Sequence, residues 1–198
     1  MKNENGLNRR NFLRASALGA TGAMIAKNGI ASSSGNQIKN SSDKIIYRTL
    51  GKTGIKVPIV SMGVMRADNP GLVRAAYAKG ITHFDTAHGY QQGRNEEMLG
   101  KILPEYERNS FFIATKVHPR GENREDGTFT SETDPKEFLD MLDMSLQRLN
   151  LDYVDFFYIH SIKSAEGALY KPLLNALEKA KQQGKVKHVG LSTHQREA

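Results

Sequence analysis

From residue 60 onward, the sequence alternates short apolar segments with longer segments that are apolar along one side. The apolar segments have the length of β-strands and are expected at residues 60–64, 81–84, 110–117, 153–160 and 186–192. The segments between them are expected to form helices at residues 72–79, 95–103, 135–149 and 169–183. Strands that are almost wholly apolar and are linked by helices are typical of a parallel β-sheet. The alternation therefore predicts an α/β fold.

The residues around the first strand distinguish between two kinds of parallel sheet. An open, doubly wound sheet that binds a nucleotide usually has a glycine-rich phosphate loop, G-x-G-x-x-G, after its first strand. Residues 61–66 read Ser-Met-Gly-Val-Met-Arg instead. Residues 44–50 and 55–59 flank the turn Gly51-Lys-Thr-Gly54, which predicts a β-hairpin ahead of the first strand. We therefore expect a (β/α)8 TIM barrel with an N-terminal hairpin.

Reactive side chains follow three of the predicted strands. Asp85 comes directly after the second strand, Lys116 lies at the end of the third, and His160 ends the fourth. Tyr90 follows Asp85 by five positions in a loop that contains glycine. Because catalytic side chains of a parallel barrel converge at the carboxyl ends of its strands, we expect these four residues to meet at one rim. An acid, a lysine, a phenol and an imidazole together suit proton donation to a carbonyl oxygen.

Metal and thiol chemistry are not indicated by the sequence. The chain has no cysteine, which excludes disulfides, thiolate metal sites and iron–sulfur ligation. His83, His88, His118 and His194 are interpreted as structural, because no pair of them has the i,i+4 helical spacing of a metal site. We therefore expect no metal ion.

The charge of the chain is concentrated near its start. The formal net charge is +7, and residues 1–31 hold five basic side chains against one acidic side chain, which is +4 of that total. No run of lysine and arginine interleaved with aromatic residues follows. The basic balance therefore does not indicate a nucleic-acid partner.

Residues 1–31 have the parts of an export signal. Residues 8–14 read Asn-Arg-Arg-Asn-Phe-Leu-Arg, and residues 17–26 are apolar but shorter than the roughly 20 residues that a membrane span needs. This arrangement resembles the twin-arginine export signature. We expect a signal peptide at 1–31, a polar linker at 32–43, recognition by the twin-arginine translocation machinery, a periplasmic or other extracytoplasmic location and no stable membrane span. A basic amphipathic helix or a disordered tail is the alternative interpretation.

From about residue 44 to the end, the sequence resembles the aldo-keto reductase family. The resemblance rests on six motifs in sequence order: Tyr47-Arg-Thr-Leu-Gly-Lys-Thr-Gly-Ile-Lys-Val-Pro, Phe84-Asp-Thr-Ala-His-Gly-Tyr90, Asn95-Glu-Glu-Met-Leu-Gly100, Ala114-Thr-Lys116, Asp155-Phe-Phe-Tyr-Ile-His160 and Gly190-Leu-Ser192. It implies a (β/α)8 barrel with a hairpin across its base. It also implies reduction of small aldehydes or ketones to alcohols with NADP(H), or with NAD(H) as the second choice.

The resemblance also implies roles for single residues. Tyr90 would be the proton donor, and Asp85 and Lys116 would form the ion pair that tunes it. His160 would orient the substrate carbonyl. Asp85 and Ser192 would contact the cofactor, Ser192 at the nicotinamide carboxamide; the residue after it is often Asn in the family and is Thr193 here. A nearby ammonium favours the phenolate form of a tyrosine, which agrees with the implied role of Lys116.

The expected strands number five, whereas a complete barrel of this type has eight. We therefore expect residues 44–198 to be an aldo-keto reductase barrel truncated after its fifth strand. Phosphate sites of such barrels commonly follow strands seven and eight, so we expect the 198-residue chain alone to be inactive. The alternative to an enzyme is a truncated or non-catalytic barrel that acts as a cofactor-sensing binding subunit.

Overall fold

The computed structural model describes residues 45–123 and 125–195 of the chain. These residues belong to one compact unit. The predicted signal peptide at 1–31 and linker at 32–43 lie outside the described residues. Within the described ranges, no helix is long and apolar enough to cross a membrane.

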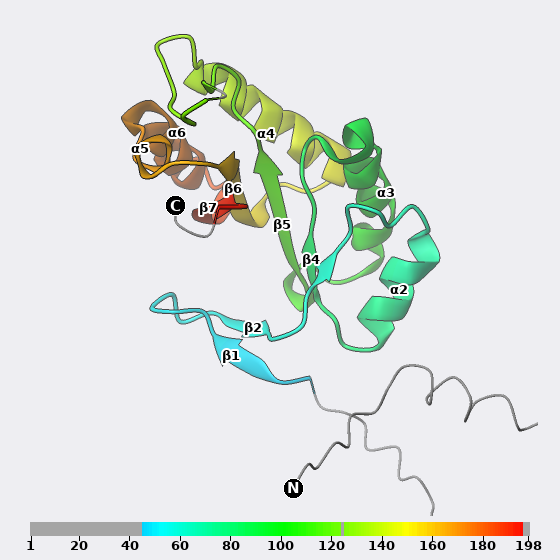
Figure 1. Ribbon diagram of the computed structural model, residues 1–198. Helices are drawn as coiled ribbons and strands as arrows, with labels where there is room; N and C mark the ends of the chain where they lie inside the picture. Colours follow the sequence, from blue (N-terminus) through cyan, green and yellow to red (C-terminus); the bar gives the residue numbers. More distant parts are fainter. Residues whose placement is uncertain (1–44, 124, 196–198) are drawn as a thin grey trace, which may run out of the picture. The chain divides into compact units, whose positions relative to one another are not determined.

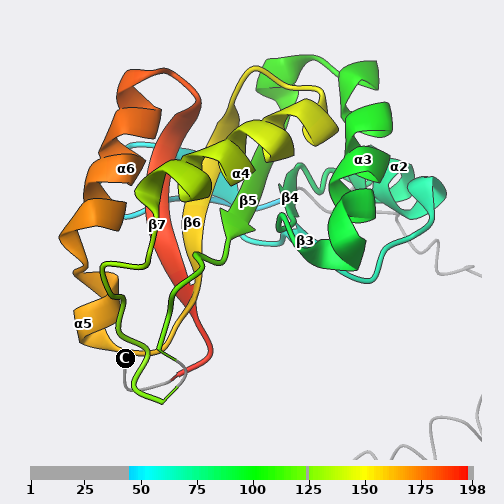
Figure 2. The same ribbon diagram turned by 90° about the horizontal axis from the view of Figure 1, so that it is seen from above.

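Five parallel strands form one sheet in the order β3-β4-β5-β6-β7 (Figure 2). Their bounds are β3 (Met62–Gly63), β4 (His83–Asp85), β5 (Phe112–Val117), β6 (Val154–Ile162) and β7 (Val186–Thr193). Each strand pairs in parallel with the next one in the chain. A doubly wound sheet would reverse this order at a switch point, whereas a (β/α)8 barrel keeps it. The predicted α/β fold and partial barrel are confirmed.

The helices cover one side of this sheet, which we call the outer face (Figures 1 and 2). Their bounds are α2 (Pro70–Ala78), α3 (Arg94–Ile102), α4 (Pro135–Leu149), α5 (Ala165–Ala168) and α6 (Lys171–Gln182). Single 3₁₀ turns occupy Leu103–Glu105 and Arg108–Ser110, and a turn with left-handed backbone at Gln91 and Gln92 occupies Tyr90–Gly93. The opposite side of the sheet is called the inner face below.

Local signals explain where the longest helix begins and ends. The side chain of Asp134 accepts a hydrogen bond from Lys136 N at 2.8 Å, and Pro135 occupies the first turn of α4. A capping carboxylate followed by proline is a favourable start for a helix. Asn150 ends α4 with a left-handed backbone (φ 53°), which asparagine tolerates better than most residues. These signals reproduce the predicted bounds of this helix.

The core lies between the outer face and the helices. Phe84, Ile113 and Phe157 project from three strands toward the helices and are completely buried. Phe138 of α4 meets Phe157 with ring centroids 5.2 Å apart, and Leu99 of α3 joins the same cluster. Since successive side chains of a strand alternate between faces, burial of Phe84 directs His83 and Asp85 to the inner face. Core packing therefore decides which side chains reach the inner face.

A two-stranded antiparallel hairpin precedes the sheet, as predicted. It consists of β1 (Tyr47–Thr49) and β2 (Lys56–Pro58), with Tyr47 opposite Pro58. Ile45, just before β1, lies against Gly80, just before β4, where an added Cβ would come within 2.7 Å of Ile45 Cγ1. The hairpin therefore starts near the amino end of β4.

Two predicted elements differ from the structure. The expected strand at 60–64 contains only the two residues of β3. Ile59, just before it, still belongs with the hairpin, since its N–H donates to Ile46 O at 2.9 Å. The helix expected at 169–183 begins at Lys171, with Pro172 in its first turn, and the separate helix α5 precedes it. Proline lacks the N–H that a continuous helix would need at that position, so a new helix starts there.

The crossing of α3 and α4 depends on a residue without a side chain. An added Cβ at Gly100 would lie 2.9 Å from the carbonyl carbon of Leu149, closer than ordinary contact allows. We expect Gly100→Ala to lower the free energy of unfolding by about 1–3 kcal/mol because the helices must move apart. Urea unfolding measures this, with Gly63→Ala as the control, since an added Cβ there has no atom within 4 Å. Equal stability of the two variants would contradict the prediction.

Candidate active site

The carboxyl ends of β4 and β5 bring a lysine and an aspartate together. Asp85 is the last residue of β4, and its register partner in β5 is Ala114, two residues before Lys116. The Lys116 ammonium forms an ion pair with the Asp85 carboxylate and donates to Thr86 O at 2.7 Å. Lys116 is only 6% exposed, so these acceptors replace most of its water.

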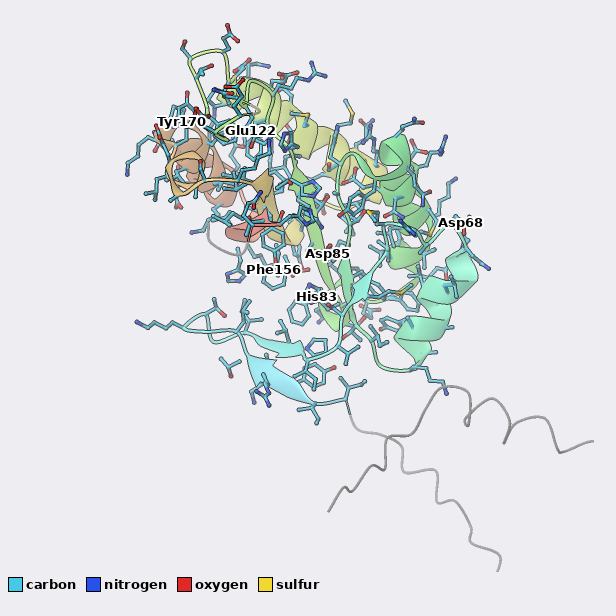
Figure 3. The ribbon with its side chains drawn as sticks, viewed as in Figure 1. Asp68, His83, Asp85, Glu122, Phe156 and Tyr170 are labelled. Carbon is cyan, nitrogen blue, oxygen red and sulfur yellow. The ribbon has the colours of Figure 1, made fainter. Side chains whose placement is uncertain are left out.

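Tyr90 and His160 lie against this ion pair. The ammonium nitrogen of Lys116 is 5.1 Å from the centroid of the Tyr90 ring. The rings of Tyr90 and His160 are 5.9 Å apart and nearly perpendicular, at 79°. The structure thus brings all four sequence-predicted residues to one rim of the sheet, and Figure 3 labels Asp85 there.

The loop that carries Tyr90 is tied to β5 and to α3. His88 N donates to Lys116 O at 2.9 Å, and Thr86 N donates to Ala114 O at 2.9 Å. The hydroxyl of Thr86 donates to the side-chain oxygen of Asn95 at 2.6 Å, and both side chains are completely buried. These bonds hold Tyr90 near Lys116 although the loop is not part of the sheet.

The imidazole of His160 is held neutral. Burial lowers the pKa of His160 to about 4, with further lowering by the positive charge of Lys116. Burial disfavours the charged form of any imidazole, and a neighbouring cation adds to this effect. At neutral pH, His160 therefore offers one N–H donor and one nitrogen acceptor.

A second phenol, Tyr158, lies two residues before His160 on the same face of β6. Burial, and then the negative charge of Asp85, raises the pKa of Tyr158 to about 12. Its ring packs on Gly190, where an added Cβ would lie 3.1 Å from Cδ1. Tyr158 was not singled out from the sequence, because the alternation of a mostly apolar strand does not separate a packing tyrosine from a reactive one.

Ser192 lies beside His160, but its hydroxyl already takes part in a hydrogen bond within the sheet. Its Oγ accepts a hydrogen bond from Ser161 N at 3.0 Å. Ser161 has a left-handed backbone (φ 65°), and the pairing of β6 with β7 is irregular between Ile159 and Ile162. Such bulges redirect side chains at the rims of barrels. Ser192 therefore stabilises the bulge that follows His160, and its contact with a cofactor stays a prediction.

His118, which was interpreted as structural from the sequence, belongs to a cluster of polar and charged side chains near the rim. His118 Nδ1 lies 2.9 Å from His160 O, and its Nε2 lies 3.4 Å from the carboxylate of Glu122. Lys163 pairs with the same carboxylate at 2.9 Å. These residues line a cavity of about 400 Å³. The sequence analysis missed Glu122 and Lys163, which lie in separate loops and belong to no motif.

The comparisons with known proteins agree with this geometry. The model of the "Aldo/keto reductase family" matches residues 60–198. The chain belongs to the aldo-keto reductase family. It is 34% identical over 161 residues to the L-glyceraldehyde 3-phosphate reductase of Escherichia coli (strain K12), and the match covers 75% of this chain and 45% of that protein.

Two further proteins show the extent of the aldo-keto reductase match. "Aldo-keto reductase yakc [NADP(+)]" of Schizosaccharomyces pombe is 33% identical, with 63% of this chain and 36% of that protein covered. The crystal structure of thermostable aldo-keto reductase Tm1743 with the inhibitor epalrestat superposes with a TM-score of 0.63 at 28% identity, covering 77% of this chain and 56% of that one. The chain thus spans less than half the length of these curated relatives. The activity and the NADP(H) dependence that are named for these relatives are therefore properties of longer proteins.

No group of three or more metal-ligating side chains of His, Cys, Asp or Glu occurs within residues 45–123 and 125–195. Polar atoms for a cofactor are present at the rim: Asp85 is 35% exposed on its side chain, and Ser192 is half-buried.

We expect His160 to remain neutral from pH 8 to about pH 5 and to take up a proton only near pH 4. The imidazole of the unfolded chain takes up its proton near pH 6.5. The free energy of unfolding should therefore fall as the pH drops from about 6.5 to about 4. NMR titration of labelled histidines measures the first effect, and urea unfolding at several pH values measures the second. In His160→Gln the pH dependence should be weaker, whereas titration of His160 near pH 6.5 would disprove the assignment.

Proposed function

We propose that the full-length protein is an NADP(H)-dependent oxidoreductase that reduces a small aldehyde or ketone to an alcohol. The observation that carries the proposal is that the Lys116 ammonium, paired with the Asp85 carboxylate, lies 5.1 Å from the centroid of the Tyr90 ring. A phenol, with an ordinary pKa near 10, is a weak acid at neutral pH, and an adjacent ammonium stabilises the phenolate that remains after proton donation. Tyr90 is therefore the proposed general acid.

Asp85 has two roles in this proposal. Its carboxylate compensates the charge of a nearly buried ammonium and fixes the position of Lys116. Without that partner, the cost of keeping a charged side chain out of water would be uncompensated. The second role is contact with the cofactor, for which the exposed part of the Asp85 side chain leaves room.

His160 is proposed to orient the substrate carbonyl. Because its pKa is lowered to about 4, the neutral ring offers an N–H to the carbonyl oxygen without competing with Tyr90 as a stronger acid. The Tyr90 and His160 rings lie 5.9 Å apart between centroids, edge to face, at the same rim.

NADP(H) is the proposed cofactor, and NAD(H) is the second choice. The nicotinamide supplies a hydride to the carbonyl carbon when it is bound. Asp85 and Ser192 would lie beside the nicotinamide end, since both are at the rim next to His160. The name of the Schizosaccharomyces pombe relative supports NADP(+). The substrate is proposed to be a small carbonyl compound, as the name of the Escherichia coli relative suggests.

The two phenols of the site provide a matched test. In the protein expressed from its complete reading frame, Tyr90→Phe should reduce kcat for carbonyl reduction by about 100- to 10,000-fold, the usual contribution of a general acid. The affinity for NADPH should stay the same, because the ring is retained. Tyr158→Phe is the control, since it removes the hydroxyl of a half-buried tyrosine on the same face. Steady-state kinetics and NADPH titration by fluorescence measure these effects.

Two outcomes would contradict the proposal. Loss of activity in Tyr158→Phe but not in Tyr90→Phe would show that Tyr90 is not the general acid. NADPH binding by the unmodified protein without turnover of any aldehyde or ketone would favour the non-catalytic, cofactor-sensing alternative.

We also propose export by the twin-arginine pathway to an extracytoplasmic location. The support is the sequence of residues 8–26, where paired arginines precede a short apolar segment. This route carries folded proteins, and a nucleotide-dependent enzyme outside the cytoplasm would need its cofactor loaded before export.

Replacing the paired arginines tests the export proposal. The double change Arg9→Lys and Arg10→Lys keeps the charge but should block export, leaving the protein in the cytoplasm. Lys27→Arg, which also keeps the charge but lies outside the pair, should be exported normally. Cell fractionation followed by immunoblotting measures both. Normal export of the double variant would refute the proposal.

A further inference from the structure

We propose that Glu96 and Arg148 are positioning residues, a buried ion pair behind the sheet that holds the Tyr90 loop in its reactive position. This inference rests on the proposed function, in which Tyr90 is the general acid. Neither residue lies on the inner face or touches the four rim residues through an ion pair or hydrogen bond. Their effect on the reaction would be transmitted through the backbone of residues 86–93.

Glu96 joins the ion pair to β5. Its side chain is completely buried, and its Oε1 accepts a hydrogen bond from the hydroxyl of Thr115 at 2.7 Å. Thr115 precedes Lys116 and projects to the outer face, also without exposure. A carboxylate buried this deeply needs a charged partner, because the cost of removing it from water is otherwise uncompensated.

Arg148 supplies that charge and also contacts the loop. From the last turn of α4, its Nη1 lies 3.3 Å from Glu96 Oε2 and donates to His88 O at 3.1 Å. The same nitrogen lies 3.4 Å from His88 Nδ1. The guanidinium also packs on Gly93, where an added Cβ would come within 2.7 Å of Nη1. One side chain thus contacts the loop at two positions, His88 and Gly93, on either side of Tyr90.

The loop between these two positions needs such support. Gln91 and Gln92 both have left-handed backbones (φ 51° and 59°), which are unfavourable for residues other than glycine. The Tyr90 N–H donates only within the loop, to Ala87 O at 3.0 Å. Strained conformations persist only where the surrounding structure enforces them. Ser145 of α4 also reaches the loop, with its Oγ 3.1 Å from His88 Nδ1, whereas Arg148 contacts the loop at both His88 and Gly93.

Arginine suits this position better than lysine. Its planar group has several N–H donors in a fixed arrangement, so it can pair with a carboxylate and donate to a carbonyl at once. A lysine ammonium at the same place would satisfy the Glu96 carboxylate but would not cover Gly93 as a flat surface. The conservative variant therefore separates charge compensation from positioning of the loop.

The experiment uses variants of the protein expressed from its complete reading frame. Arg148→Lys keeps the charge, and the double variant Glu96→Gln with Arg148→Met removes the ion pair without leaving a buried charge unpaired. Lys136→Met is the matched control, because Lys136 is an exposed cation of the same helix that pairs with Asp140. Each variant is tested for kcat and KM, for NADPH affinity, and for amide hydrogen exchange of residues 86–93.

We expect the double variant to lose about 10- to 100-fold in kcat, the effect of a small misplacement of a catalytic group. NADPH affinity should be unchanged within twofold. Hydrogen exchange should accelerate about tenfold or more in residues 86–93 and stay unchanged in β5 and β6. Arg148→Lys should have a smaller effect on both quantities, and Lys136→Met should have none.

Two results would overturn the inference. One is unchanged exchange of residues 86–93 in the double variant; the other is acceleration of exchange throughout the sheet, which would show a purely structural role. Failure of the proposed function is recognised separately: if Tyr90→Phe keeps full activity, Tyr90 is not the acid. Faster loop exchange together with undiminished kcat, in a protein where Tyr90→Phe is inactive, would also overturn the inference.

Discussion

The arrangement of the rim depends on one buried charge, the ammonium of Lys116. An ammonium that is 6% exposed is stable only if nearby acceptors replace the water that it has lost. Here the acceptors are the carboxylate of Asp85 and the carbonyl of Thr86, both at the end of the neighbouring strand. The parallel register of β4 and β5 places them there. The ion pair thus couples the ends of two strands and the start of the loop that carries Tyr90.

The other groups around this charge are kept neutral by burial. His160 loses its tendency to take up a proton, and Tyr158 loses its tendency to release one. Both effects have the same origin, since burial disfavours the charged form of a base and of an acid alike. The rim therefore combines one paired cation with neutral hydrogen-bonding groups. Such an environment suits a reaction in which negative charge develops on a carbonyl oxygen and is removed by a proton.

The support of the rim comes from the outer face of the sheet. Thr86 is bonded to Asn95 of α3, and Thr115 is bonded to Glu96 of the same helix. Thr86 follows Asp85 and Thr115 precedes Lys116, so each member of this ion pair has a neighbour that is fixed to a helix. This explains why the Asn95-Glu96 pair belongs to the sequence motif although neither residue reaches the inner face. Helix packing and site geometry are therefore linked through single residues of β4, β5 and the loop that follows β4.

The strand order and most helix positions could be predicted because their signals are local. Asp134 and Pro135 define the start of α4, and Asn150 defines its end. The alternation of apolar segments was sufficient to predict five parallel strands. The shortness of β3 was not predictable from the apolar pattern of residues 60–64, because it depends on how this segment pairs with β4. The division of the expected helix at residues 169–183 was indicated by Pro172 but was overlooked.

The candidate site shows the same division between sequence and structure. By itself, the sequence determined the family resemblance, the strand ends and the four rim residues, since each of these depends on residue type at a position along the chain. The tertiary structure alone decided which groups share an environment. The half-buried position of Tyr158, the hydrogen bond of Ser192 to the bulge at Ser161 and the contact of Arg148 with His88 join residues that are distant in sequence or depend on backbone conformation. Burial and charge act through space, and only folding decides which residues become neighbours.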